Sequence, residues 1–416
     1  MKLACRFFVL VFVLTLFSLT SFAQIYEWRG PNRSGVYQED NLLKKWPTSG
    51  PELLWEKNGI GFAYSSATVT KETVYVTGRK GEDDVLTALT LDGAEKWSMI
   101  YGKAWTRNFD GTRSTPTVVG DRIYLISGVG DMVCVNSDGK MLWSQNHYKL
   151  YDSKPVMFGV SESPLYVDDK IIASPGGSKA SLVAFNAANG EVVWEAEPLN
   201  EGPLYVNPLL INHKGRKIIV TNTNMHIIGV DATNGKLLWK VNYDETSDIG
   251  GRSFKNHANT PIYHDGKIFV AAGHKFVGIQ LVLSDDGSAV ELGWKNKDIN
   301  THLGGMVLID GYLYSSNFIH NSMGNWVCVD WETGETKWST KWYNKGSIIS
   351  DGEMLYLFEE KFGHLALANI NSERLDIVSE FKINIGKGQY WSHPVIGDGK
   401  LYIRHGETLQ VYSIKQ

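Results

Sequence analysis

The chain has 416 residues, enough for one large or two ordinary domains, and 43% of them are hydrophobic, as in a globular protein. Its 14 Trp and 42 Gly, with few long helical patterns, indicate many short strands joined by turns. The formal net charge of −4 and the lack of a Lys/Arg block argue against a nucleic-acid surface or a basic membrane-surface helix.

Residues 1–23 have the pattern of a signal peptide. Basic residues precede an apolar run at 7–19, and the small-x-small sequence SFA ends at Ala23. We expect cleavage before Gln24; the alternative is an uncleaved anchor helix. Cys5 precedes the apolar run, so it is badly placed for lipid attachment. No later segment has about 18 consecutive apolar residues, so we expect an exported monomer, periplasmic or extracellular, with no transmembrane segment in the mature chain.

A short pattern that ends in Trp recurs along the rest of the chain. It reads GKLLW at 235–239, and the same ending returns every 42 to 55 residues. The residues that carry it are Trp55, Trp97, Trp143, Trp194, Trp239, Trp294 and Trp338. A near-fixed period of this size indicates a repeat architecture. We expect these Trp side chains to pack between neighbouring sheets rather than to stack on a ligand.

Each unit contains four short strand patterns separated by tight turns, which is the content of one propeller blade. The final unit, 392–416, has three strands and no Trp strand, whereas an orphan Trp strand stands at 51–59. Joining the two completes a blade and removes an open sheet edge. The sequence therefore predicts an all-β fold, a strap at 24–51 followed by an eight-bladed β-propeller of four-stranded antiparallel blades at 52–416, its last blade closed by the N-terminal Trp strand. Seven blades are the alternative if the unit near 375–381, which lacks its Trp, is misread.

Two cysteines, Cys134 and Cys328, occupy the same repeat position in the second and sixth units. These units are opposite blades of an eightfold ring, and a disulfide needs Cα atoms within about 7 Å. We therefore predict two free, buried thiols at a position that is filled elsewhere by Ala88, Ala184 or Gly229.

The residues that break the repeat lie just before the first strand of each blade. That strand lines the central channel, so the preceding segments should meet at one channel mouth, where the scaffold positions variable loops. Polar and aromatic residues found there in only one or two units are candidates for a ligand or partner site. They are Arg113, Glu162, Asn207, His257, Asn259, His302, Lys345, Tyr390, Trp391 and His393. The alternative is a mutually paired channel mouth that holds no ligand.

Within this set, His257 and His302 share one register, and Glu162, Asn259 and Lys345 share a second, two residues further on. In an extended segment the two registers point to the same side. The histidines lack the close spacing of a metal-binding element, so we predict no metal site. The chain also has no nucleophile motif, phosphate loop or haem-attachment motif, and its catalytic residues, if any, stay unknown.

The sequence GKLLW at 235–239, preceded by VDATNG at 230–235, resembles the pyrroloquinoline-quinone (PQQ)-like propeller repeat. This repeat occurs in quinoprotein dehydrogenases and in the outer-membrane assembly lipoprotein of the β-barrel machinery. The segments EWRGPNRSGVY (27–37), NTPIYHDGKIFVAAGH (259–274) and SHPVIGDGKLYIRHG (392–406) are most similar to secreted bacterial PQQ-like repeat proteins, some of them polyvinyl-alcohol-dehydrogenase-like. The resemblance covers nearly all of the mature chain and implies the propeller fold.

The resemblance leaves three functions open. The first is a non-catalytic exported propeller that binds a small ligand or an envelope protein at the channel mouth. The second is a PQQ-dependent oxidoreductase acting on alcohols, and the third is an envelope assembly scaffold. PQQ dehydrogenases of the alcohol type are longer and carry an adjacent cysteine pair that this chain lacks, and the lipid-attachment cysteine of the assembly lipoprotein is also missing. We expect a non-catalytic binding or scaffold module with no nucleic-acid partner.

Overall fold

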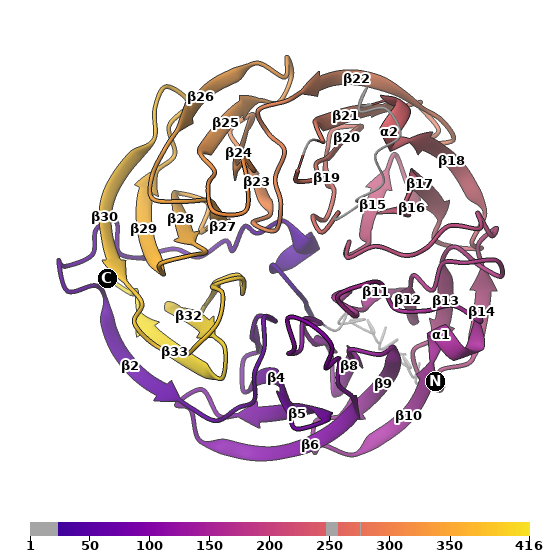
Figure 1. Ribbon diagram of the computed structural model, residues 1–416, viewed down its shortest axis with the longest axis horizontal. Coiled ribbons are helices and arrows are strands. Elements are labelled where there is room, and N and C mark those ends of the chain that lie inside the picture. The colour runs from indigo at the N-terminus through magenta and orange to yellow at the C-terminus, as the bar shows by residue number, and fades with distance from the viewer. Residues whose placement is uncertain (1–23, 247–256, 275) are drawn as a thin grey trace, which may run out of the picture.

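The computed structural model is a closed ring of sheets around a central axis (Figure 1). It describes residues 24–246, 257–274 and 276–416, so the expected signal peptide lies outside the described residues. Within the described part of the chain, eight sheets with antiparallel neighbouring strands form. In seven of them the four blade strands follow sequence order from the channel to the rim, and in the eighth the outer strand comes from the N-terminal part of the chain. The predicted eight-bladed propeller is confirmed.

The strands of the blades follow one another along the chain. Blades 1 and 2 consist of β3 (Thr68–Val69), β4 (Val74–Lys80), β5 (Asp83–Leu89) and β6 (Glu95–Lys103), and of β7 (Thr117–Val119), β8 (Arg122–Ile126), β9 (Asp131–Asn136) and β10 (Met141–Asn146). Blades 3 and 4 consist of β11 (Leu165–Val167), β12 (Lys170–Ala173), β13 (Val183–Asn186) and β14 (Val192–Glu195), and of β15 (Leu209–His213), β16 (Arg216–Asn222), β17 (His226–Asp231) and β18 (Leu237–Asn242).

The second half of the ring repeats this arrangement. Blades 5 and 6 consist of β19 (Ile262–His264), β20 (Lys267–Val270), β21 (Gly278–Leu283) and β22 (Val290–Asn296), and of β23 (Met306–Ile309), β24 (Tyr312–Ser316), β25 (Trp326–Asp330) and β26 (Thr336–Thr340). Blades 7 and 8 consist of β27 (Gly346–Ser350), β28 (Met354–Glu359), β29 (His364–Asn369) and β30 (Asp376–Lys382), and of β31 (Val395–Gly397), β32 (Lys400–His405), β33 (Thr408–Ser413) and β2 (Glu52–Lys57). Short helical turns occur at η1 (Pro31–Arg33), α1 (His147–Leu150) and α2 (Tyr243–Thr246).

Blade 8 joins the two ends of the chain. Its outer strand β2 pairs antiparallel with β33, with Trp55 opposite Val411. The predicted closure by the N-terminal Trp strand is therefore confirmed. Since the unit near 375–381 forms a genuine fourth strand, β30, the seven-bladed alternative is excluded.

The repeat Trp side chains bind each blade to the next. In blade 2 a β-bulge at Leu142 sets Trp143 opposite Cys134. The indole then donates a hydrogen bond of 3.0 Å to the backbone oxygen of Ala187 in blade 3. A Cβ on Gly190 would lie 2.7 Å from the ring, so only glycine allows the indole to approach this turn so closely. The predicted packing of Trp between neighbouring sheets is confirmed.

The two cysteines lie where the repeat register places them. Cys134 and Cys328 are buried and free, and each is opposite its blade's Trp, as Ala88, Ala184 and Gly229 are in other blades. Blades 2 and 6 stand opposite each other in the ring. The prediction of two unpaired, buried thiols is confirmed.

The strap runs through the ring instead of around it. Its first residues form β1 (Ile25–Tyr26), which adds a fifth strand to the channel side of blade 2. The indigo segment that follows crosses the centre of the ring (Figure 1). It then forms a parallel bridge between Val36 and Ser350 of blade 7 and reaches blade 8, where the Leu43 N–H donates to the Ile414 oxygen at 2.7 Å.

Blade 7 obtains its missing Trp from the strap. In β30 the register puts Ser379 at the position that Trp occupies in other blades. The strap residue Trp46 is buried beside it, with its backbone N–H 2.9 Å from the Ser379 hydroxyl. Its ring lies 5.8 Å from that of Tyr356, just as Trp143 lies 6.2 Å from Tyr124 in blade 2. A residue distant in sequence thus fills the inter-blade gap.

Candidate functional site

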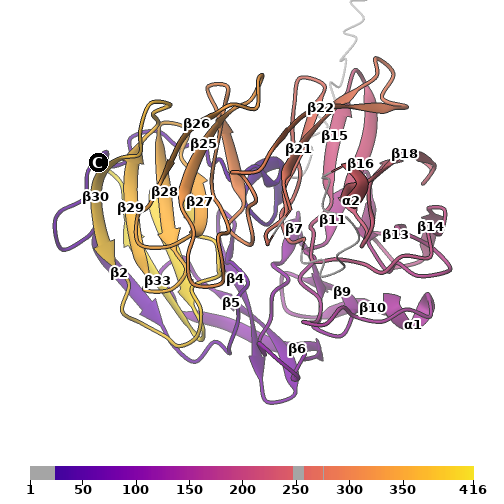
Figure 2. The ribbon, with the colours of Figure 1, turned by 45° about the horizontal axis from the view of Figure 1, so that its top comes forward.

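The blades present two different ends. In a four-stranded antiparallel blade, the 2–3 loops and the 4–1 loops between blades lie at one end, and the 1–2 and 3–4 turns lie at the other. We call the first end the loop face. Figure 2, in which the ring is tilted, shows the strands running between these two ends. The predicted site residues belong to the 4–1 loops, so they lie at the loop face or on the channel wall beneath it.

The centre of the channel is filled by Arg29 of the strap. Its guanidinium donates to the backbone oxygens of Ile348 at 3.0 Å and Met306 at 2.6 Å, on blades 7 and 6. It also lies 2.7 Å from Nδ1 of His393 in blade 8, while Nε2 of that ring lies 2.9 Å from the oxygen of Leu303. Because a carbonyl oxygen only accepts, Nε2 carries the proton and Nδ1 accepts from Arg29. Burial and the Arg29 charge lower the pKa of His393 to about 3, which agrees with this neutral form.

A second strap residue, Arg33, fills the channel beside blades 3 and 4. It pairs with Glu27 at 2.8 Å and donates to the backbone oxygens of Pro164 and Pro208. Glu162 lies close enough for the Arg33 charge to act on it, but burial dominates and raises the pKa of Glu162 to about 8. One carboxyl oxygen of Glu162 accepts from the Ser174 N–H, and the other has no hydrogen-bond partner within the described residues.

Three predicted residues hold neighbouring segments together. The Asn207 amide oxygen accepts from the Ser163 N–H, which joins blades 3 and 4. The Asn259 amide group donates to the Thr301 oxygen at 2.7 Å and accepts from the Gly305 N–H at 3.1 Å, which joins blades 5 and 6. The His257 ring packs edge-on against Tyr243 and Phe276. All three are buried, so their contacts are those of inter-blade supports.

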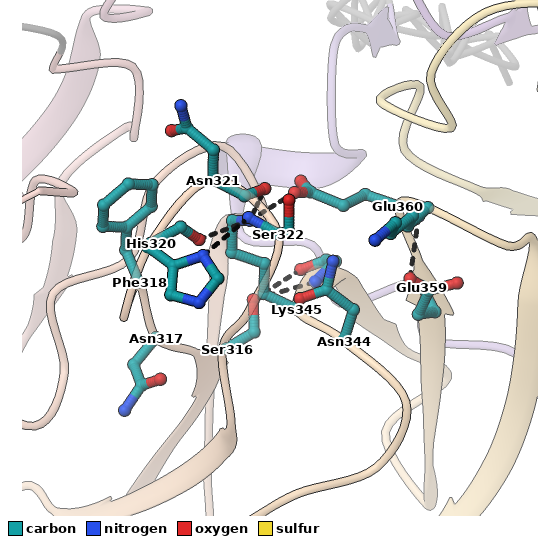
Figure 3. Close-up of polar contacts among 12 residues, drawn as sticks. Ser316, Asn317, Phe318, His320, Asn321, Ser322, Asn344, Lys345, Glu359 and Glu360 are labelled. Carbon is teal, nitrogen blue, oxygen red and sulfur yellow. Dashed lines mark hydrogen bonds and ion pairs between the residues drawn. The ribbon is translucent and has the colours of Figure 1, made fainter.

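Lys345 lies in a second cluster, between blades 6 and 7 (Figure 3). Its ammonium forms a buried ion pair of 2.6 Å with Glu360, a residue that the sequence analysis did not single out. His302 belongs to the same neighbourhood, since its ring lies 5.0 Å from that of Phe318, above which the ammonium sits. Burial and the charges of His274 and Lys345 lower the pKa of His302 to about 3, so the ring is neutral.

A run of aromatic rings connects the 4–1 loops of blades 8, 1, 2 and 3. The ring centre of Trp391 lies 4.9 Å from that of Tyr64 and 5.3 Å from that of Phe109. The ring centre of Phe109 lies 5.6 Å from that of Phe158. We call Tyr64, Trp391, Phe109 and Phe158 the aromatic arc. The guanidinium carbon of Arg113 lies 5.5 Å from the centre of the Tyr64 ring. The Tyr390 ring is not part of this run and stacks on the His405 ring, with 3.6 Å between the ring centres.

The ten predicted residues therefore fall into three groups by their contacts: channel-wall residues beside the strap, inter-blade supports, and loop-face residues near the aromatic arc or the Lys345 cluster. Sequence reasoning missed Arg29, Arg33 and Glu360. The strap did carry a signal, because EWRGPNR places two Arg in a segment with no strand pattern and no acidic partner beyond Glu27. Glu360 carried none, since nothing in the sequence distinguishes it from the many carboxylates of other loops.

Among the described residues, neither a metal cluster nor a membrane-spanning helix is present. No three His, Cys, Asp or Glu side chains gather there in a way that could hold a metal ion. Within the same ranges, no helix is long and apolar enough to cross a membrane.

The blade repeat, the Trp contacts and the ring closure define a PQQ-like β-propeller repeat protein. The family model of the outer membrane protein assembly factor BamB matches residues 92–340, more than half of the chain. The chain therefore belongs to this family. No curated protein matches the sequence.

Solved structures share the fold at low sequence identity. BamB from Moraxella catarrhalis is 12% identical with a TM-score of 0.63, covering 87% of this chain and 99% of its own. A europium-containing methanol dehydrogenase is 12% identical with a TM-score of 0.60, covering 90% and 88%. Sqt1 of Saccharomyces cerevisiae is 10% identical with a TM-score of 0.58, covering 88% and 100%. At these identities the likeness concerns the fold alone.

Proposed function

We propose that the protein is a non-catalytic, exported scaffold that docks a partner protein on its loop face. The observation that carries the proposal is the set of large apolar side chains exposed around the aromatic arc. Phe109 within the arc is 46% exposed, and Met157, next to Phe158, is 60% exposed. Exposed aromatic and Met side chains on a rigid surface are typical of protein interfaces. The arc spans the loops of four blades, so one partner would contact several blades at once.

Membership of the BamB family supports a particular setting for this docking. That family is named for a factor in outer-membrane protein assembly. We infer that the partner is a component of the outer-membrane protein assembly machinery. The predicted signal peptide is consistent with such a location, since it would deliver the chain to the envelope.

The residues at the channel do not fit PQQ. This cofactor is a flat quinone with several carboxylates, so its site needs cations with unused donors. The cations at the channel are already bonded: Arg29 and Arg33 to backbone oxygens, and Lys345 to Glu360. Trp391 has an aromatic face for stacking but packs against Tyr64 and Phe109. The channel donors therefore support a packed structural plug better than a cofactor site.

Capture from native envelopes tests the docking proposal. The chain 24–416, tagged at its C-terminus, would be incubated with detergent-solubilised envelope membranes of its host, and captured proteins would be quantified by mass spectrometry. We expect enrichment of the outer-membrane assembly machinery. We expect the double variant Phe109→Ser, Met157→Ser to lose at least about tenfold of this enrichment, because about 1.4 kcal/mol of lost binding energy is enough for that.

A matched variant controls for general loss of surface hydrophobicity. Ile100 and Val193 are 57% and 50% exposed, but they lie on the outer strands β6 and β14. Ile100→Ser, Val193→Ser should retain the enrichment. The proposal fails if the wild-type chain does not enrich the assembly machinery, or if the two double variants lose it equally.

A further inference from the structure

The Lys345 ammonium uses all three of its N–H donors within the loop face. One bonds the Glu360 carboxylate at 2.6 Å, and the others point to the backbone oxygens of Asn321 at 2.9 Å and His320 at 3.3 Å (Figure 3). The last two residues belong to the 2–3 loop of blade 6, at 317–325. The ammonium also lies 5.3 Å above the ring of Phe318 in the same loop. A buried cation thus sets the path of this loop.

Glu360 extends the link to blade 8. It follows β28 directly, in the 2–3 loop of blade 7, and its backbone N–H donates to the oxygen of Lys345 at 3.0 Å. Its own backbone oxygen accepts from the N–H of Tyr390, the residue before Trp391, at 3.1 Å. Glu360 therefore connects Lys345, through its carboxylate, to the loop that carries Trp391 of the aromatic arc, through its backbone.

Stability alone does not account for such a pair. A buried ion pair loses so much hydration that apolar residues of equal volume often stabilise a protein as well or better. An apolar side chain at 345 would fill the space but could not hold the oxygens of His320 and Asn321. The charged pair instead fixes the conformation of the loops whose backbone it bonds. The two loops that the pair joins expose Ile319 and Phe362, whose accessible fractions are 47% and 44%.

We propose that Lys345 and Glu360 are positioning residues of the docking surface, which hold the 2–3 loop of blade 6 and the 4–1 loop before blade 8 in the arrangement that a partner protein meets. The pair itself is too buried to be the main contact: the side chain of Lys345 is 2% exposed and that of Glu360 11%. It acts through Ile319 on one side and Trp391 on the other. This inference rests on the proposed docking function of the loop face.

Hydrogen–deuterium exchange of the chain 24–416 tests the positioning role without a partner. Lys345→Met keeps the volume and removes the three donors, and Glu360→Gln removes the charge. We expect either variant to raise amide exchange about tenfold in both 317–325 and 386–393, while exchange in the inner strands β23, β27 and β31 stays unchanged. Lys217→Met, which breaks the exposed Lys217–Asp168 pair at the other end of the ring, should change neither loop.

The same variants in the envelope capture assay connect the pair to docking. We expect Lys345→Met and Glu360→Gln to lower enrichment of the assembly machinery and Lys217→Met to leave it at the wild-type level. Faster exchange throughout the blades would make the pair a general support of the fold and overturn the proposal, as would unchanged exchange in either loop. If the loops loosen but the wild-type chain captures nothing, the positioning of the loops stands and the docking function fails.

Discussion

Among single residues, Glu162 is a carboxyl group whose surroundings disfavour its charged form. It is buried in the channel wall beside Arg33, yet it receives only one hydrogen bond from a backbone N–H, on one of its two oxygens. Burial disfavours the carboxylate and raises its pKa from 4.5 to about 8. At neutral pH the folded chain therefore holds a proton on Glu162 that the unfolded chain has already released.

This difference predicts how stability varies with pH. Since the folded-state pKa is raised, the contribution of Glu162 is fully present below pH 4.5 and is lost as pH rises through about 8. In urea unfolding, we expect the wild-type free energy of unfolding to fall by up to about 1.4 kcal/mol per pH unit across this window. Glu162→Gln, which cannot ionise, should flatten the curve. Glu197→Gln, at an exposed position, should not. Parallel curves for wild type and Glu162→Gln would contradict this account.

At the level of single residues, the sequence shows which positions differ between repeats but not what those residues contact. Asn259 and Lys345 share a register before their strands, and both are buried. Asn259 nevertheless bonds the backbone of the next blade, whereas Lys345 bonds a carboxylate. The difference arises from the facing loops, whose conformations have no repeat pattern from which they could be predicted.

Among the elements, the strap carries the largest departure from the repeat. Ser379 stands at the Trp position of blade 7, and Trp46 packs there against Tyr356 and Phe381. The sequence shows that this unit lacks its Trp. Trp46 could not be assigned to the gap from the sequence, because most of the chain separates the strap from β30 and hydrophobic periodicity indicates only local contacts.

Trp46→Ala tests this assignment. Removing a buried Trp that fills an inter-blade gap should lower the free energy of unfolding by about 3–5 kcal/mol. Urea unfolding followed by circular dichroism would measure the loss. Trp391→Ala, at a half-buried loop position, is the control and should cost much less. Equal, small losses in the two variants would mean that blade 7 is stable without the strap indole.

For the whole molecule, the ring arrangement decides the state of the cysteines. Blade count and register, both readable from the repeat, place Cys134 and Cys328 on opposite sides of the channel. The eightfold ring was predictable because every blade repeats the same local pattern. The filling of its centre by Arg29 and Arg33 was not, since one strap serves the entire ring and has no counterpart in the repeat.

The thiols should be inert in the folded chain. Burial raises the pKa of Cys134 to about 11 and that of Cys328 to about 12, so neither forms appreciable thiolate at neutral pH. We expect the chain 24–416 to react with a thiol reagent only after unfolding, when both cysteines are modified. A reductant should leave the unfolding midpoint unchanged. An intramolecular disulfide found by mass spectrometry under non-reducing conditions would contradict the arrangement.

The contacts of the strap also determine when folding can be completed. It is synthesised first, yet its last part contacts Ser350, Ser379 and Ile414, which come late in the chain. The outer strand of blade 8 likewise waits for β33. Such distant pairing is slow and comes late in folding. A chain cut short before β33 would leave Leu43 at the end of the strap and the strand β2 without their partners, so we expect proteases to remove such incomplete products.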